Sequence, residues 1–266
     1  MKTFLVLIAT IGSIGCATSR PQLPEFHSAR KATLDEVLAA YEAYCAGMQT
    51  FSGAGDLEVR DLRTGRSRKV GVRVIASRDR RLYLKGSVLV VTALELVSDG
   101  RRFWLEVPSK HTVWTGPSDA PSEAEDADHA PYYALRPSDV TFALLPEPIE
   151  TTGHEALIFE ADPETFSLAT ARLEEGRGSV QKRIWLDRET LRLRRASLYG
   201  ASGDVVAEAD FGGWEGGLPR EVTISRPLDG YVASFALNKA EANVRVPDRL
   251  FEARIPEGFA VEEVGG

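Results

Sequence analysis

The first regular pattern in the chain is a series of apolar residues at three- and four-residue steps between residues 33 and 48. This spacing places one apolar stripe along a helix, and the stripe must be buried against another part of the protein. Its members are Leu34, Val37, Leu38, Tyr41, Cys45 and Met48. Thr33 and Glu36 have the spacing of a capping box, so the pattern predicts an amphipathic helix that begins at Thr33 and ends near Gly47.

From Phe51 onwards the pattern changes to an alternation of apolar and polar residues, which is typical of strands with one buried face. Turn signals such as Thr64-Gly65, Asp99-Gly100 and Asp229-Gly230 separate the alternating stretches. In the second half of the chain, strands are expected at 155–161, 166–173, 179–187, 190–199, 204–211, 219–226 and 231–238.

Most consecutive strands have no helix between them, which excludes a doubly wound parallel sheet. We therefore expect a mainly β protein of the α+β class, with a single, strongly curved antiparallel sheet of about ten to twelve strands. The helix at 33–48 and a short second helix at 138–145, capped by Ser138, are the elements available to plug the concave face. No internal repeat is evident, so residues 33–266 are expected to form one domain.

Residues 1–15 have the pattern of a targeting signal. Lys2 precedes an apolar run of about a dozen residues, which as a helix spans about 18 Å and is shorter than the roughly 30 Å hydrocarbon core. Ser13-Ile14-Gly15-Cys16 resembles the bacterial lipobox, whose cysteine is acylated. We expect a lipoprotein signal peptide at 1–15, lipidation (a palmitate-type anchor) at Cys16, and a tether up to residue 32; an ordinary secretory peptide cut near Ala17 is the alternative. By the same resemblance, Ala17 after the cysteine indicates the outer membrane.

Composition and charge exclude several classes of function. The formal net charge is −7, so no global positive field recruits nucleic acid. The two cysteines cannot build a disulfide framework or a thiolate zinc cage, and Cys45, on the apolar side of the first helix, is expected to be a buried, inert thiol. The four histidines have no partners at metal-ligand spacing. We expect no catalytic residue, no metal and no cofactor, hence no enzyme.

Several motifs, in their order along the chain, resemble the LolA/LolB-like family of periplasmic lipoprotein carriers and receptors. They are the helix from Leu34 to Met48, the run Thr50 to Leu57, the run Leu94 to Gly100, Val113 to Gly116, and the C-terminal run Val246 to Gly258. The resemblance covers about residues 33–260. It implies an incomplete β-barrel with helices that cover an apolar cavity, and a cavity that takes up the acyl chains of lipoproteins in transit.

Apolar strand residues would line such a cavity, although alternation alone does not say which sheet face is concave. The candidates are Leu38, Tyr41, Val72, Val74, Leu82, Leu84, Leu94, Leu96, Trp104, Ile184 and Leu186, with Leu191 and Leu193 as further wall residues. Binding would be driven by apolar burial, at about 0.8 kcal/mol per methylene.

The run Val88, Leu89 and Val90 follows the strand 81–84, where the receptor member of the family has a protruding loop that enters the bilayer. The resemblance makes these three residues candidates for a membrane-insertion loop. The alternative is a buried strand that continues to Leu94 and Leu96.

Basic residues are frequent in the first hairpins. They are Arg60, Arg63, Arg66, Arg68, Lys69, Arg73, Arg78, Arg80 and Arg81. They form either a solvated strand face or a surface that meets anionic headgroups.

Two functional hypotheses follow. In the first, the chain is a monomeric, lipid-anchored protein on the periplasmic face of the outer membrane; it binds acyl chains of lipoproteins or lipids, aids their delivery, and takes cargo from a soluble periplasmic carrier. In the second, the same fold is a non-enzymatic sensor that recognises a protein partner, and its cavity is vestigial. A hollow concave face favours the first hypothesis, and a filled one favours the second.

Overall fold

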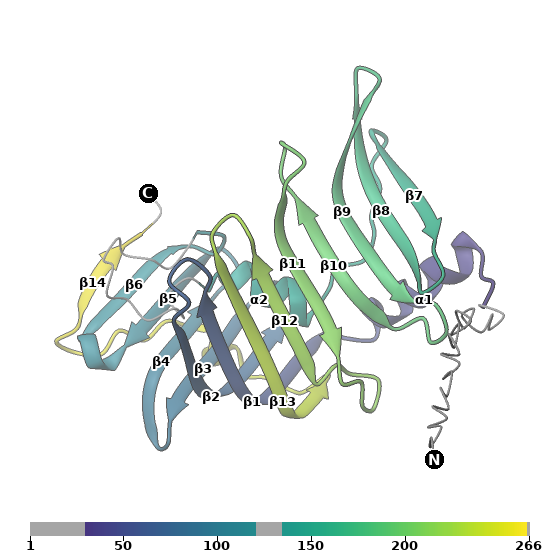
Figure 1. Cartoon of the computed structure of the whole chain (residues 1–266). Coiled ribbons are helices and arrows are strands. Elements are labelled where there is room, and N and C mark those ends of the chain that lie inside the picture. Colours follow the sequence, from purple (N-terminus) through teal and green to yellow (C-terminus); the bar gives the residue numbers. More distant parts are fainter. Residues whose placement is uncertain (1–29, 121–134, 265–266) are drawn as a thin grey trace, which may run out of the picture.

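The computed structural model describes residues 30–120 and 135–264. Figure 1 shows them as one curved sheet with its helices on the inner side. The predicted signal peptide, Cys16 and nearly all of the tether lie outside the described residues, as does the acidic segment 121–134. Within the described part of the chain, no helix is long and apolar enough to cross a membrane.

Fourteen strands of the described residues pair into a single sheet, which confirms the mainly β architecture. Their bounds are β1 Thr50–Asp61, β2 Ser67–Ser77, β3 Leu82–Val88, β4 Val91–Ser98, β5 Arg102–Val107, β6 Thr112–Pro117, β7 Glu155–Ala161, β8 Thr165–Glu174, β9 Arg177–Asp187, β10 Leu193–Tyr199, β11 Val205–Gly212, β12 Glu221–Arg226, β13 Tyr231–Ala242 and β14 Ala260–Glu263.

The strand order is β14-β6-β5-β4-β3-β2-β1-β13-β12-β11-β10-β9-β8-β7. Two antiparallel meanders, β1 to β6 and β7 to β13, are therefore joined through the pairing of β1 with β13. The sheet stays open, because β14 and β7 end the strand order and do not pair with each other.

The expected number of strands was too low, and one pairing differs from the expected antiparallel sheet. The turn between β3 and β4 consists of Leu89 and Val90, which carry no turn signal, so the run from Leu82 to Ser98 reads as continuous in the sequence. β14 is short and all four of its residues are exposed, so its burial pattern has no alternation, and it pairs with β6 in parallel.

The first helix, α1 (Leu34–Ala46), begins as predicted. The Thr33 backbone N–H donates to Glu36 Oε2 at 2.7 Å, and the Glu36 N–H donates to Thr33 Oγ1 at 3.3 Å, so the capping box is present. The buried stripe includes Val37, Tyr41 and Cys45. Burial raises the pKa of the Cys45 thiol, which agrees with the expected inert core residue.

The second helix, α2 (Pro137–Leu144), begins one residue before the predicted start. Ser138 is not its cap: Arg136 holds the N-cap position without a side-chain hydrogen bond, and Pro137 lies in the first turn. Proline is favoured there because its missing N–H has no intrahelical partner in any case.

The helix α2 contacts β2, β3 and β4 on one side and β12 on the other, although β1 and β13 separate these strands in the sheet. One short helix reaches both groups only if the sheet bends around it. The concave face is therefore the face that carries α2, and it is the inner face of the curve in Figure 1.

Candidate functional site

Most of the apolar residues predicted to line a cavity lie together on the concave face, under the two helices. On the strands they are Val72, Val74, Leu82, Leu84, Leu94, Leu96, Ile184 and Leu186, with Leu193 beside them; Tyr41 is buried on α1, and Leu38 and Leu191 pack at the border of the cluster. The two halves of the sheet thus share one continuous apolar face.

Trp104 is the exception, and its predicted place in the cavity wall was wrong. In the pairing of β4 with β5, Leu96 lies opposite Leu105, and Trp104 lies opposite Val97. Successive side chains of a strand point to opposite faces, so Trp104 lies on the convex side while Phe103 and Leu105 point inward. The adjacent apolar pair Phe103-Trp104 hides this alternation in the sequence.

The concave face is filled by the protein's own side chains. Of the strand residues named above, from Val72 to Leu186, none is more than 5% exposed. The two helices form a cover over this face. Its buried side chains are Val37, Tyr41 and Cys45 of α1 and Val140, Ala143 and Leu144 of α2. A ligand can reach this face only if the helices move.

Arg78, directly after β2, joins the C-terminal ends of both helices. Its guanidinium donates to the Cys45 carbonyl at 2.5 Å and the Met48 carbonyl at 2.7 Å after α1, and to the Leu145 carbonyl at 3.3 Å and the Pro146 carbonyl at 2.7 Å after α2. Carbonyls at a helix C-terminus lack intrahelical partners and carry partial negative charge, so one cation stabilises both ends. We call this contact the Arg78 clasp.

Glu147 adds a second tie beside the clasp. Its backbone carbonyl accepts hydrogen bonds from Tyr41 Oη of α1 at 2.7 Å and from Lys182 Nζ of β9 at 2.9 Å. Burial lowers the pKa of Lys182. A polar hollow of about 420 Å³, lined by Arg78, Arg80 and Lys182 among others, adjoins these contacts. Water in that hollow can hydrate the carbonyls if the clasp opens.

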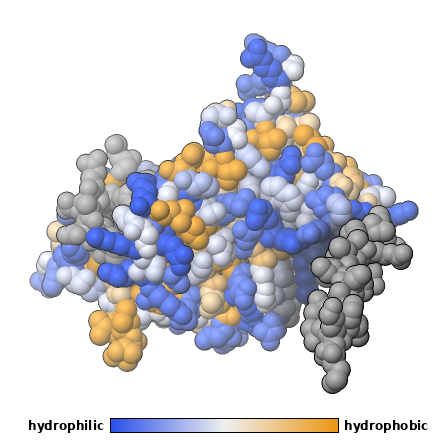
Figure 2. Space-filling model, in the orientation of Figure 1, coloured by the Kyte–Doolittle hydropathy of each residue, from blue (hydrophilic) through white to orange (hydrophobic). Residues whose placement is uncertain are grey.

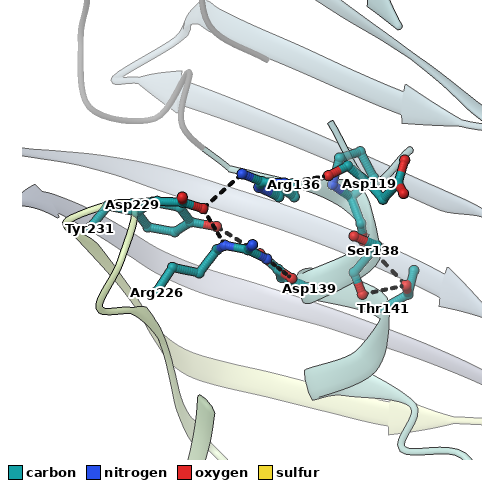
Figure 3. Close-up of polar contacts among 9 residues, drawn as sticks. Asp119, Arg136, Ser138, Asp139, Thr141, Arg226, Asp229 and Tyr231 are labelled. Atoms are coloured by element: carbon teal, nitrogen blue, oxygen red, sulfur yellow. Dashed lines mark hydrogen bonds and ion pairs between the residues drawn. The ribbon is translucent and has the colours of Figure 1, made fainter. Parts of the chain in front are cut away.

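A buried ion pair fixes α2 to the sheet (Figure 3). Arg226 Nη1 of β12 donates to Asp139 Oδ1 of α2 at 2.8 Å, and Tyr231 Oη donates to Oδ2 of the same carboxylate at 2.8 Å. The side chains of Arg226 and Asp139 are 10% and 4% exposed. Asp229 pairs with Arg226 and with Arg136, which extends the network to the start of α2. Burial raises the pKa of Asp139, and the Arg226 charge opposes that shift.

The cover has a small apolar recess at the edge of α1. The recess holds about 90 Å³ and is lined by Tyr41, Tyr44, Leu186, Leu191, Leu193 and Trp214 among others. The Tyr44 and Trp214 rings meet edge to face at 5.7 Å. A larger hollow of about 530 Å³ lies over Trp185, Arg195 and Asp210 on the convex face, so it does not lead to the apolar cluster.

Val88, Leu89 and Val90 lie at the tip of the β3–β4 hairpin. Val88 is 52% exposed, Leu89 95% and Val90 97%, and the next residue, Val91, is 67% exposed. This exposure excludes the buried-strand alternative. Figure 2 shows the resulting apolar knob standing out from a largely polar surface. Leu89 also has a φ of 55°, in the left-handed region that favours glycine or asparagine.

Sequence reasoning missed the residues that hold the cover shut. Arg78 stood in the basic cluster as one cation among nine, and Asp139 and Arg226 are 87 positions apart. The one feature of the sequence that could have singled out Arg78 is its position directly after a buried strand. The feature that could have singled out Asp139 is a carboxylate that stands among apolar residues in a short helix.

Replacement of Arg78 by methionine keeps the aliphatic stem and leaves four carbonyls without their donor. We expect Arg78→Met to lower the free energy of unfolding by about 2–4 kcal/mol and to increase hydrogen exchange in α1 more than in the central strands. The matched control is Arg80→Met, which removes an exposed pair with Glu147 and is expected to change stability by less than about 1 kcal/mol. Equal effects of the two substitutions would contradict the clasp.

Replacement of Asp139 by asparagine keeps the shape of the side chain and removes its charge. We expect Asp139→Asn to destabilise the protein by about 3 kcal/mol in urea unfolding, because Arg226 loses its most buried counter-charge. Tyr231→Phe removes one hydrogen bond to the same carboxylate and is expected to cost about 1 kcal/mol. If the two variants unfold at the same urea concentration as the unmodified protein, the ion pair does not hold α2.

Comparisons with known proteins define the fold. No family model and no curated protein matches the chain. Among solved structures, a LolA superfamily protein from Nitrosomonas europaea is similar over 84% of this chain and 99% of its own, with 12% identity and a TM-score of 0.51.

Two further solved structures are similar over most of the chain. A DUF1329 family protein from Desulfovibrio piger covers 81% of this chain and 97% of its own, at 15% identity and a TM-score of 0.48. A candidate outer membrane lipoprotein-sorting protein domain from Vibrio parahaemolyticus covers 80% and 95%, at 11% identity and a TM-score of 0.44. The likeness to the Nitrosomonas protein shows that this chain has the LolA-like fold: an open, curved sheet with few helices on its concave face.

Proposed function

We propose that this protein binds acyl chains of lipoproteins or lipids between its curved sheet and its two helices, and aids their delivery to the outer membrane. The observation that carries the proposal is the continuous apolar concave face under a cover that one arginine holds shut. The LolA-like fold, shared with the Nitrosomonas protein, supports it.

Binding is an exchange of one apolar partner for another. When α1 moves, its stripe of Val37, Tyr41 and Cys45 leaves the sheet, and an acyl chain takes its place. Each methylene buried stabilises the complex by about 0.8 kcal/mol, and the strand residues remain covered throughout. The Arg78 clasp sets the free energy needed to open the cover.

The recess at Tyr44 and Trp214 is the place where an acyl chain begins to enter. It is apolar, borders α1, and leads towards Leu186 and Leu193 of the buried cluster. Trp214 belongs to a loop in which Gly213, Gly216 and Gly217 have positive φ values, and this loop contacts α1 through Tyr44. Displacement of the Trp214 ring from Tyr44 opens the edge of the helix.

The hairpin tip serves delivery. Val88, Leu89 and Val90 stand clear of the body, and large apolar patches on a soluble surface mark sites of membrane or protein contact. Insertion of the tip brings the protein body to the bilayer surface, where released acyl chains enter the membrane.

The anchor completes the proposal. Cleavage after the signal peptide 1–15 leaves an acylated Cys16, and its two or three chains hold the protein at the periplasmic face of the outer membrane. The protein then acts as a non-enzymatic monomer, and a soluble periplasmic carrier is its proposed donor.

The filled concave face favours a second candidate. If the helices stay closed, the same fold acts as an envelope sensor that recognises a protein partner. The side chains that fill the face, 5% exposed or less, are the observation that supports this candidate.

Acyl binding is tested on the full-length protein purified from bacterial envelopes. Native mass spectrometry is expected to show bound fatty acyl species, and a fluorescent palmitate analogue is expected to bind several-fold faster to Arg78→Met than to Arg80→Met, because the clasp is open. A protein without bound lipid that takes up no analogue, with either substitution, would exclude the carrier and leave the sensor.

Delivery is tested with Leu89→Glu, which places a charge at the hairpin tip. We expect transfer of the palmitate analogue to vesicles to slow on the order of tenfold, because a carboxylate opposes entry into the bilayer. The melting temperature should not fall, since Leu89 is almost fully exposed. Leu228→Glu, at an exposed site in the turn before β13, is the matched control; equal slowing by both substitutions would exclude a specific role of the tip.

A further inference from the structure

Cationic side chains lie on both sides of the β3–β4 hairpin tip. In the pairing of β2 with β3, Gly71 lies opposite Ser87, so the first residues of β2, Arg68 among them, lie at the same end of the sheet as the hairpin tip. Arg66 precedes β2 at the same end of the sheet. On the other side of the hairpin, the turn η1 (Pro108–Lys110) contacts β4 and brings in Lys110. Arg66, Arg68 and Lys110 are all exposed.

Within the described part of the chain these three cations form no ion pair, whereas other members of the basic cluster do. Lys69 pairs with Asp56 at 2.9 Å and Arg60 with Glu58 at 3.3 Å.

At the other end of the strands, Arg80 pairs with Glu147 at 2.8 Å and Arg81 with Asp79 at 2.5 Å. Arg66, Arg68 and Lys110 form no ion pair with a described residue, and neither does Arg73, which lies further along β2 opposite Lys85. Positive charge therefore remains around the tip.

The residues of the hairpin turn at the tip are not those that a tight turn normally prefers. A two-residue hairpin turn favours asparagine, aspartate or glycine, yet the turn here is Leu89-Val90, and Leu89 has a positive φ. A bulky apolar residue in that conformation is strained, because its Cβ approaches the following carbonyl oxygen. Such conflicts between local preference and structure concentrate at functional surfaces.

We infer that this surface, the apolar tip 88–91 with its flanking Arg66, Arg68 and Lys110, docks on a bilayer with anionic headgroups. The inference rests on the proposed function, since it names the membrane that the tip meets. The apolar residues enter the boundary of the hydrocarbon, and the three cations stay at the depth of the headgroups. Surface charges act within a Debye length of about 8–10 Å, so only cations next to the tip contribute.

The expected selectivity follows from the charges. Each basic residue near an anionic surface contributes about fivefold to partitioning. The tip should therefore enter an anionic bilayer far more readily than a zwitterionic one, and salt should abolish the difference.

The experiment places an environment-sensitive dye on the tip of the full-length protein through Leu89→Cys. Vesicles of phosphatidylcholine are compared with vesicles that also contain phosphatidylglycerol. The dye emission should shift to the blue mainly with phosphatidylglycerol, and high salt should reverse the shift. The same dye on Ser202→Cys, in the exposed turn after β10, reports any labelling or binding that does not involve the tip.

Reversal of the charge at single positions then tests which cations contribute to membrane binding. Arg68→Glu in the labelled protein should raise the phosphatidylglycerol concentration needed for half of the shift at least fivefold. Arg177→Glu is the matched control, because Arg177 is exposed at the start of β9, away from the tip.

Equal shifts with both vesicle types, or equal effects of Arg68→Glu and Arg177→Glu, would overturn the inference. A tip that stays in water with every vesicle would also overturn it and would favour a protein partner. None of these results depends on acyl binding, which the mass-spectrometry experiment tests separately.

Discussion

The Arg78 clasp is the contact on which the closed structure depends. A curved sheet with one apolar face needs a cover, and the two helices that supply it come from distant parts of the chain. Each helix ends with carbonyls that have no partner within the helix. The guanidinium of Arg78 has several donors and hydrogen-bonds to carbonyls at both helix ends. A single side chain therefore links α1 to α2, and links both helices to the end of β2.

The two helices are held to the rest of the protein in different ways. The buried Asp139–Arg226 pair, with Tyr231, fixes α2 to β12 and β13. Within the described residues, no ion pair joins α1 to the sheet; its attachments are apolar packing and hydrogen bonds such as those to the Cys45 carbonyl and from Tyr41 Oη. Breaking the buried pair leaves a charge without its partner inside the protein, whereas the carbonyls released by Arg78 can be hydrated through the adjoining polar hollow. We therefore propose α1 as the helix that moves when an acyl chain binds.

The sequence determined the elements well and the contacts between them poorly. Alternation and the Thr33–Glu36 capping box are local, so the strands from β7 to β13 and the start of α1 followed directly. The place of Trp104 did not follow, because two adjacent apolar residues leave the inward face undecided until the partner strand sets the register. Arg78 and the Asp139–Arg226 pair did not follow either, since their partners are brought together only by the bend of the sheet. The exposed tip combined an apolar run with a turn that has no turn residues, a combination that local rules assign to a strand.

The central claim is that an acyl chain takes the place of α1 on the concave face. Spin labels on Ala39→Cys in α1 and Ser225→Cys in β12 occupy solvent-accessible positions and report the distance between helix and sheet. With palmitic acid at a concentration that saturates binding, double electron–electron resonance should show a longer distance that is absent from the lipid-free protein. A distance that stays the same while palmitic acid is bound would contradict the account.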